Sequence, residues 1–173
     1  MSSKWTKFGV CLALLGMMPT HARAVAPYEP HSVGSWKITR VDDACWAYAV
    51  IDKGAAFAIA LGRDAGLLAV SNDGWEWLDS RQGETLPITY DFGEWTIKAT
   101  GQVGDVLGRR SIQSILRFSD GDELWRTWAS SWHVDIFAEG NFLKSYVFAG
   151  DESGDGGHAS AALELARCMQ TLK

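Results

Sequence analysis

The chain has 173 residues, and its 16 Lys and Arg residues against 21 Asp and Glu residues give a formal net charge of −5. An acidic chain with scattered basic residues argues against a nucleic-acid backbone or an anionic membrane surface as partner. The length fits one domain with a sizeable core.

Residues 1–24 have the pattern of a secretory signal peptide. Two lysines precede an apolar run over residues 8–18, and small residues lead up to Ala24. The run is shorter than the roughly 20 apolar residues of a spanning helix, and no later stretch is long enough either. We expect cleavage after Ala24, so that Cys11 leaves with the peptide and the mature chain starts at Val25. That chain keeps 13 basic and 21 acidic residues, a net charge of −8, and is expected to be periplasmic or secreted.

Two cysteines, Cys45 and Cys168, remain near opposite ends of the mature chain. In an oxidising compartment an even count predicts a disulfide. A structural zinc site is not expected, because no histidine stands at ligand spacing from either cysteine.

The mature chain begins with a predicted tether, residues 25–33, which contains two prolines and no periodicity. From Gly34 onward, short runs with period-two alternation predict strands separated by turns. Residues 45–51 are almost continuously apolar, which predicts a strand buried on both faces. The other strands are expected at residues 36–39, 57–61, 66–70, 88–92, 95–99 and 112–118, with turns at 52–54 and 62–66.

The pattern then changes to helical spacing. Asp120 is a candidate N-cap before a helix of two or three turns that carries Leu124, Trp125 and Trp128. A hairpin over 134–148 follows, and the chain closes with a helix over about 158–171 whose inward stripe contains Cys168. We therefore predict one β-rich α+β domain over residues 34–173. It is an antiparallel sandwich or strongly curved sheet of about eight strands, with a short middle helix and a C-terminal helix anchored by the disulfide.

The order of these markers resembles a known group of proteins. The markers are G-x-W-x-I at 34–38, Cys45 on the next strand, V-S-N at 70–72 leading to a tryptophan, D-F-G at 91–93, and the closing A-L-E-L-A-R-C at 162–168. They resemble small secreted alphaproteobacterial proteins that keep W-x-V…C near the start and A-L-x-x-L-x-x-C at the end. More remotely the chain is similar to invasion-associated locus B-type periplasmic proteins. The resemblance implies a periplasmic or secreted location and supplies no catalytic residue.

Tryptophan is unusually frequent, with nine in the chain and eight after the signal peptide. Trp36, Trp46 and Trp95 lie on strand patterns and are expected in the core. A second set contains two tryptophans expected on one strand face and three at helical spacing. These five side chains either form a stripe in the core or line an exposed patch that binds a protein or a carbohydrate. The members of this candidate aromatic patch are Trp75, Trp77, Trp125, Trp128 and Trp132.

Other motifs with chemical potential each have a structural alternative. Asp151, Ser153 and Asp155 match the first half of a calcium loop, but position twelve is Ala162 where a bidentate Glu is required. This loop is a weak metal candidate and otherwise a solvated loop before the last helix. No metal or cofactor is predicted.

Two acid pairs, Glu76 with Asp79 and Asp91 with Glu94, could serve a glycoside hydrolase or simply stabilise turns. His133 could be a general base or a structural strand residue. The pair at 109–110, two arginines, is expected in a solvated loop.

The sequence leaves three functions open. The preferred one is an exported, non-catalytic binding module that acts on a protein or envelope component. The alternatives are a small envelope hydrolase and a structural or stress-related envelope protein without a discrete ligand.

Overall fold

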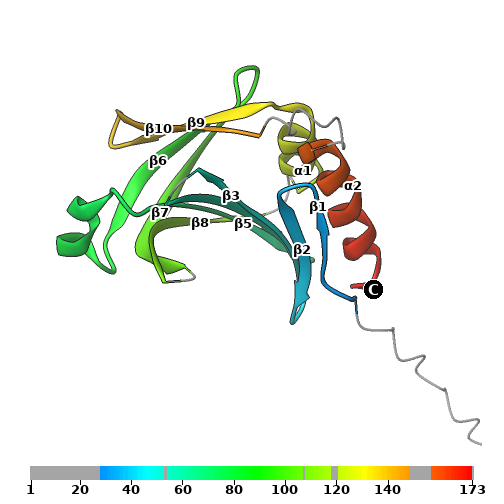
Figure 1. Cartoon of the computed structure of the whole chain (residues 1–173). Coiled ribbons are helices and arrows are strands. Elements are labelled where there is room, and N and C mark those ends of the chain that lie inside the picture. The colour runs from blue at the N-terminus through cyan, green and yellow to red at the C-terminus, as the bar shows by residue number, and fades with distance from the viewer. Residues whose placement is uncertain (1–27, 53, 107, 118–120, 149–156, 173) are drawn as a thin grey trace, which may run out of the picture.

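The computed structural model describes residues 28–52, 54–106, 108–117, 121–148 and 157–172, and these form one strongly curved antiparallel sheet with three short helical segments (Figure 1). The ten strands are β1 (His31–Val33), β2 (Trp36–Val41), β3 (Ala44–Asp52), β4 (Ala55–Leu61), β5 (Ala65–Asn72), β6 (Thr85–Asp91), β7 (Thr96–Val106), β8 (Arg109–Arg117), β9 (His133–Ala138) and β10 (Asn141–Val147).

The strand order in the sheet is β1-β2-β3-β4-β5-β8-β7-β6-β9-β10, and every neighbouring pair is antiparallel. The predicted β-rich α+β fold with a curved antiparallel sheet is confirmed, with ten strands instead of about eight. The segment predicted to be a tether contributes β1, in which Val33 pairs with Trp36 of β2.

A cluster of aromatic side chains joins strands from the two ends of the sheet. The Trp36 ring of β2 lies 5.8 Å from Phe148, which follows β10, and 5.0 Å from Trp128. Phe57 of β4 lies 4.9 Å from Phe148 and 6.3 Å from Tyr146 of β10. All five side chains are at most 2% exposed. The core therefore fills the concave face, where the sheet bends back toward itself.

The convex face of the sheet has no second layer among the described elements, and this corrects the prediction for residues 45–51. In β3, Cys45, Ala47 and Ala49 are buried, whereas the alternate residues Trp46 and Tyr48 are only partly buried. The strand is thus buried on one face only. Period-two alternation is obscured here because the residues on the convex face are also apolar.

Two further expectations about side-chain location are wrong. Trp95, expected in the core, is 49% exposed because it lies in the turn before β7, where its carbonyl accepts a hydrogen bond from the Phe92 amide. Arg109 and Arg110, expected in a solvated loop, begin β8 and bind Asp73 and Asp79.

The helical segments are η1 (Glu76–Arg81), a 3₁₀ helix, and the α-helices α1 (Gly121–Ser130) and α2 (Gly157–Gln170). Both α-helices confirm predicted elements; the candidate N-cap Asp120 lies outside the described residues. No described helix is long and apolar enough to cross a membrane.

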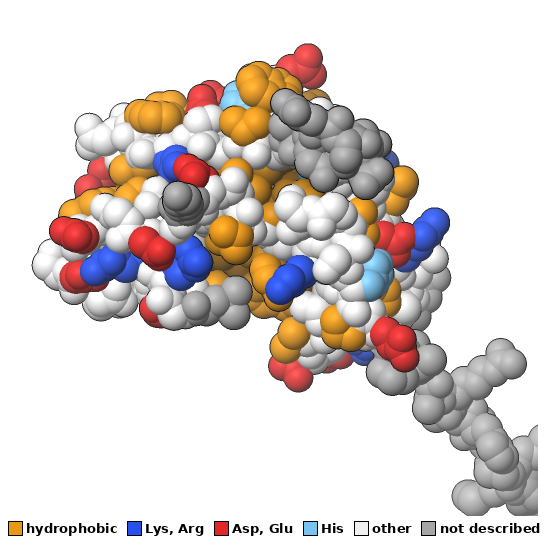
Figure 2. Space-filling model, in the orientation of Figure 1, with side chains coloured by type: hydrophobic (Ala, Val, Ile, Leu, Met, Phe, Trp, Pro, Cys, Tyr) orange, Lys and Arg blue, Asp and Glu red, His pale blue; other side chains and the backbone are white. Residues whose placement is uncertain are grey.

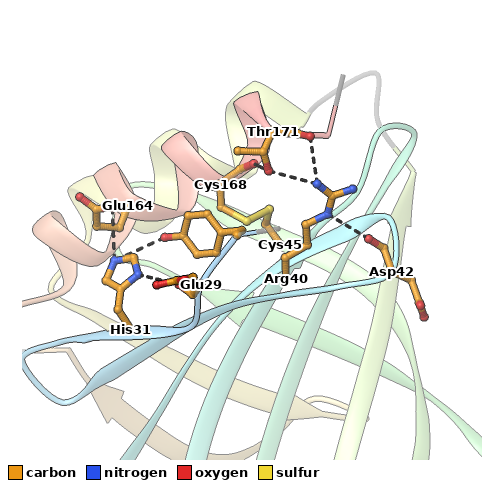
Figure 3. The surroundings of a disulfide bond; sticks show 9 residues. Glu29, His31, Arg40, Asp42, Cys45, Glu164, Cys168 and Thr171 are labelled. Atoms are coloured by element: carbon orange, nitrogen blue, oxygen red, sulfur yellow. Dashed lines mark hydrogen bonds and ion pairs between the residues drawn. A yellow bond between two sulfur atoms is a disulfide. The ribbon is translucent and has the colours of Figure 1, made fainter. Parts of the chain in front are cut away.

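The inward stripe of α2 packs on β2 and β3, and Ala161, Leu165 and Cys168 on it are fully buried. Cys168 forms the predicted disulfide with Cys45 of β3, with 5.9 Å between the Cα atoms (Figure 3). Arg40 of β2 donates a 3.0 Å hydrogen bond to the Thr171 carbonyl, and Arg63 donates one of 2.7 Å to the Leu172 carbonyl. Residues 168–172 are therefore held against the sheet by one covalent bond and by hydrogen bonds from two arginines.

We expect the stability of the fold to depend on pH through His158, the second residue of α2. Its ring lies 5.9 Å from that of Phe148, and burial lowers its pKa, opposed by hydrogen bonds to the backbone of Phe148 and Ala129. A pKa lower in the folded state means that the unfolded chain takes up the proton first. This stabilisation is therefore complete above about pH 6.5 and is lost as the pH falls through the lowered folded-state pKa.

We expect the melting temperature to fall over that window, and the fall to be smaller in the His158→Gln variant. Thermal unfolding at matched ionic strength measures both slopes. Equal slopes in the two proteins would show that His158 does not contribute.

Candidate functional site

The five tryptophans of the predicted aromatic patch do not share one surface. Trp75 is 6% exposed and Trp128 is fully buried. Trp125 is partly buried, and its indole Nε1 donates a 2.9 Å hydrogen bond to the Ala162 carbonyl, which joins α1 to α2. These three residues belong to the packing of the fold.

The two exposed members, Trp77 and Trp132, lie near opposite ends of β9. Trp77 belongs to η1, not to a strand shared with Trp75, and its ring is covered by Arg81, which binds Glu139 just after β9. Trp132 directly precedes β9 and is 63% exposed. Six strand residues span about 20 Å, so no single small ligand contacts both rings.

The acid pairs are engaged in local structure. Arg110 binds Asp79, with 2.7 Å between Nη2 and Oδ2, and this hydrogen bond lowers the pKa of Asp79. A general acid needs the opposite shift. Asp91 Oδ1 accepts a hydrogen bond from the Gly93 amide, as in a turn, and Glu94 is exposed. The pairs therefore give no support to a hydrolase.

His133 is the first residue of β9, and its ring lies 4.0 Å from that of Trp132. Its Nδ1 atom is buried and has no hydrogen-bond partner among the described residues. The candidate calcium loop at 151–155 lies outside the described residues. Within the described ranges, no three His, Cys, Asp or Glu side chains are grouped so that they could hold a metal ion.

The sheet is split between β7 and β8. β7 pairs with β6 from Thr96 to Gln102, but its pairing with β8 starts only at Gly101. β8 pairs with β5 as far as Arg117, but its pairing with β7 ends at Ser114. Among the described strands, residues 96–100 and 115–117 therefore each have a neighbour on one side only. In Figure 1, β6 and β7 rise toward β9 while β8 continues beside β5.

The alternation of the ladder shows which backbone groups face this split. The Val103 amide donates to the Glu84 carbonyl, and the Val103 carbonyl accepts from Gly83, so the backbone of Val103 faces β6. Because successive residues of a strand point their amides and carbonyls to opposite sides, those of Thr96, Lys98 and Thr100 face the split. On the opposite side of the split, Gln113 of β8 is the partner of Gln102. Ile115 and Arg117 lie two and four residues after Gln113, so their amides and carbonyls also face the split.

Gly101 marks the point where the two strands diverge. A Cβ atom on it would come closer than 3.0 Å to side-chain carbons of both Ile112 and Ile88. The backbone of β7 can therefore lie this close to Ile88 and Ile112 only because residue 101 has no side chain, as at the tight bends of curved sheets. The split is thus a consequence of how β7 bends around its neighbours.

The split opens into a half-open cavity of about 480 Å³, a size typical of ligand sites. Its floor is Leu124 and Thr127 of α1, both 3% exposed, and Trp95 stands on its rim with half of its surface exposed. Lys98 and Arg117 also line it, and the described lining residues include no Asp or Glu. The cavity therefore combines an apolar floor, two cations and unpaired strand backbone.

Comparisons with protein-family models, with curated proteins and with solved structures found no match to this chain. The site consequently rests on its own geometry. Sequence reasoning missed it, because the divergence of β7 and β8 depends on the register of four strands. A glycine at position 101, two residues after the strand predicted over 95–99, was a local signal that this segment is unusual.

Proposed function

We propose that this chain is an exported, non-catalytic binding module of the cell envelope that holds an extended segment of a partner protein in the split between β7 and β8. The observation that carries the proposal is a row of backbone groups, those of Thr96, Lys98 and Thr100, that face no other described strand. Unpaired strand edges are templates for another strand, and several peptide-binding domains use this mode of recognition.

The side chains around the split support a peptide ligand over a purely apolar molecule. A strand added along β7 would direct alternate side chains toward Leu124 of α1 and toward solvent. Trp95 on the rim offers a large rigid contact surface of the kind that dominates binding hot spots. Lys98 and Arg117 favour a segment that carries Asp or Glu on its outward side.

Export is supported by two independent features. The first 24 residues have the order of a signal peptide, and the Cys45–Cys168 disulfide suits an oxidising compartment. The surface is consistent with a protein partner in the envelope, and the acidic mature chain argues against nucleic acid.

The free protein tests the geometry of the site. We expect the amides of Lys98 and Thr100 to exchange with solvent much faster than those of Ile97 and Ala99, which face β6. Hydrogen exchange of the oxidised protein followed by NMR measures this alternation. Equal protection of all four amides would mean that the split is closed in solution.

Binding is tested with capped hexapeptides that alternate valine with glutamate, and with a matched set in which lysine replaces glutamate. We expect the acidic set to slow exchange of the Lys98 and Thr100 amides and the lysine set to bind more weakly. In the Lys98→Pro variant, loss of the amide that faces the split should weaken binding about tenfold or more. The Lys98→Ala variant keeps that amide and should show a smaller loss.

A proline that unfolds β7 would alter the circular dichroism spectrum, and this spectrum is recorded for both variants. Should neither peptide set protect these amides, or should the Pro and Ala variants bind equally well, strand addition in the split is wrong.

A further inference from the structure

A second surface lies on the convex face of the sheet, away from the core. Its floor consists of Ala58, Ala60 and Ala69, which are 3–7% exposed although they point away from the concave core. Trp46 and Tyr48 of β3 form one wall, and Leu67 of β5 extends the surface toward β8. We call this surface the outer groove.

The outer groove is apolar over several adjacent strands, and it ends in charged residues. Figure 2 shows a hollow lined by hydrophobic side chains near the middle of the view, with Lys or Arg side chains on both sides of it. Val50, at one end of the β3 wall, is 54% exposed, and Val41, near the other end of the groove, is 51% exposed. Exposed apolar side chains therefore lie at both ends of the groove, and apolar patches of this kind often serve as contact surfaces.

Charged side chains line both ends of the groove: Arg109 lies at one end, and Asp43, Arg63 and Asp64 lie at the other. Lys37 lies beside one end of the β3 wall, where its ammonium is 6.0 Å from the centre of the Tyr48 ring. Asp42 and Asp43 lie at the opposite end of the same edge, in the exposed turn between β2 and β3. Lys37 and Asp42 are five positions apart along the strand, a distance of about 16 Å.

Two copies can face each other about a two-fold axis that lies in the plane of the groove, perpendicular to the strands. In that arrangement β2 of one copy lies over β2 of the other, and the two strands run in opposite directions. Under this operation Lys37 of one copy meets the Asp42–Asp43 turn of the other, twice, by symmetry. The alternative axis, along the strands, brings like ends together and gives no such pairing. Isologous interfaces of this kind are the commonest in homo-oligomers.

We propose that the outer groove packs against the outer groove of a second copy of this chain, with Lys37 of each copy facing Asp42 and Asp43 of the other. The surface of four strands over about six residues amounts to roughly 400 Å² per copy, about half of a standard interface. The dimer is therefore weak and reversible, and it forms at micromolar concentrations or above. This interface uses the convex face and does not depend on the peptide site proposed above.

Sedimentation velocity of the oxidised protein, from about 1 µM to about 500 µM, tests the dimer. We expect a reversible monomer–dimer equilibrium across this range. The Val50→Lys variant should raise the dissociation constant about tenfold or more, because it places a charge in the apolar contact. Val147→Lys on β10 is the matched control, since Val147 is 43% exposed and lies outside the groove, and it should leave the equilibrium unchanged.

A charge exchange tests the proposed orientation. Lys37→Glu alone and the pair Asp42→Lys with Asp43→Lys should each weaken the dimer, and the three changes together should restore much of it. A protein that stays monomeric up to the highest concentration overturns the proposal, as does a dimer that Val50→Lys leaves intact. Failure of the triple variant to recover affinity overturns the two-fold arrangement. None of these outcomes bears on peptide binding, which is measured separately by amide exchange.

Discussion

Replacing both cysteines, as Cys45→Ala with Cys168→Ala, is expected to lower the free energy of unfolding by about 5 kcal/mol, a value that follows from loop closure. The bond joins residues that are 123 positions apart, so it restricts most of the unfolded chain. Both cysteines are completely buried, and the alanine side chains would also leave small voids beside Leu165 and its neighbours.

The loss should be unevenly distributed over the structure. The disulfide is the covalent bond between α2 and β3 (Figure 3). Without it, the segment after the helix is held by hydrogen bonds from Arg40 and Arg63. We expect the amides of residues 158–172 to lose protection before those of β4 and β5 in the middle of the sheet.

Urea unfolding of the oxidised protein, of the same protein under reductant, and of the double variant measures these effects. Reduction isolates the effect of the bond, because both sulfur atoms stay in place, whereas the double variant adds the cost of the voids. If the oxidised and reduced proteins unfold at the same urea concentration, the bond does not stabilise the fold.

Truncation of the central aromatic side chain, Trp36→Ala, is expected to cost about 3–5 kcal/mol, the range for large aromatic residues in cores. Trp36 is 1% exposed and contacts Phe57, Trp128 and Phe148. Phe57 belongs to β4 and Trp128 to α1, and Phe148 directly follows β10. The substitution therefore removes a central part of the contact between the two ends of the sheet, while the contacts of Phe57 with Tyr146 and Phe148 remain.

A matched control is Trp132→Ala, which removes an indole that is 63% exposed and should change stability by less than about 0.5 kcal/mol. Chemical unfolding gives both values on the same scale. Near-ultraviolet circular dichroism should also report a loosened environment of the remaining core aromatics in the Trp36 variant alone. Similar costs for the two substitutions would mean that closure of the sheet does not depend on this cluster.

Local features of the sequence predicted much of the fold. Alternation at residues 57–61 and 95–99 indicated strands, glycine-containing segments such as 52–54 indicated turns, and helical spacing placed Cys168 on the inward face of the last helix. Each of these inferences depends on residues that are close together in the sequence. Over such short distances the backbone conformation determines the periodicity of the side chains. The pairing of Cys45 with Cys168 followed because only two cysteines remain after the predicted cleavage.

The candidate site could not be predicted in the same way. The sequence shows that tryptophans are abundant, but their exposure depends on which face of a curved sheet is covered. Trp75 and Trp128 are in the core, whereas Trp95, on a good strand pattern, stands in a turn at the rim of the split. Their positions are set by contacts between residues far apart in the chain.

By itself, the sequence determined the β-rich α+β class, the two α-helices and the disulfide, because short-range periodicity and cysteine count specify them. Only the tertiary structure decided that the sheet closes on an aromatic cluster, that its convex face stays apolar and uncovered by the described elements, and that β7 and β8 part at Gly101. These features arise from the register and curvature of strands distant in sequence. A side chain on Gly101 would collide with Ile88 and Ile112, and no local pattern records that both lie beside it.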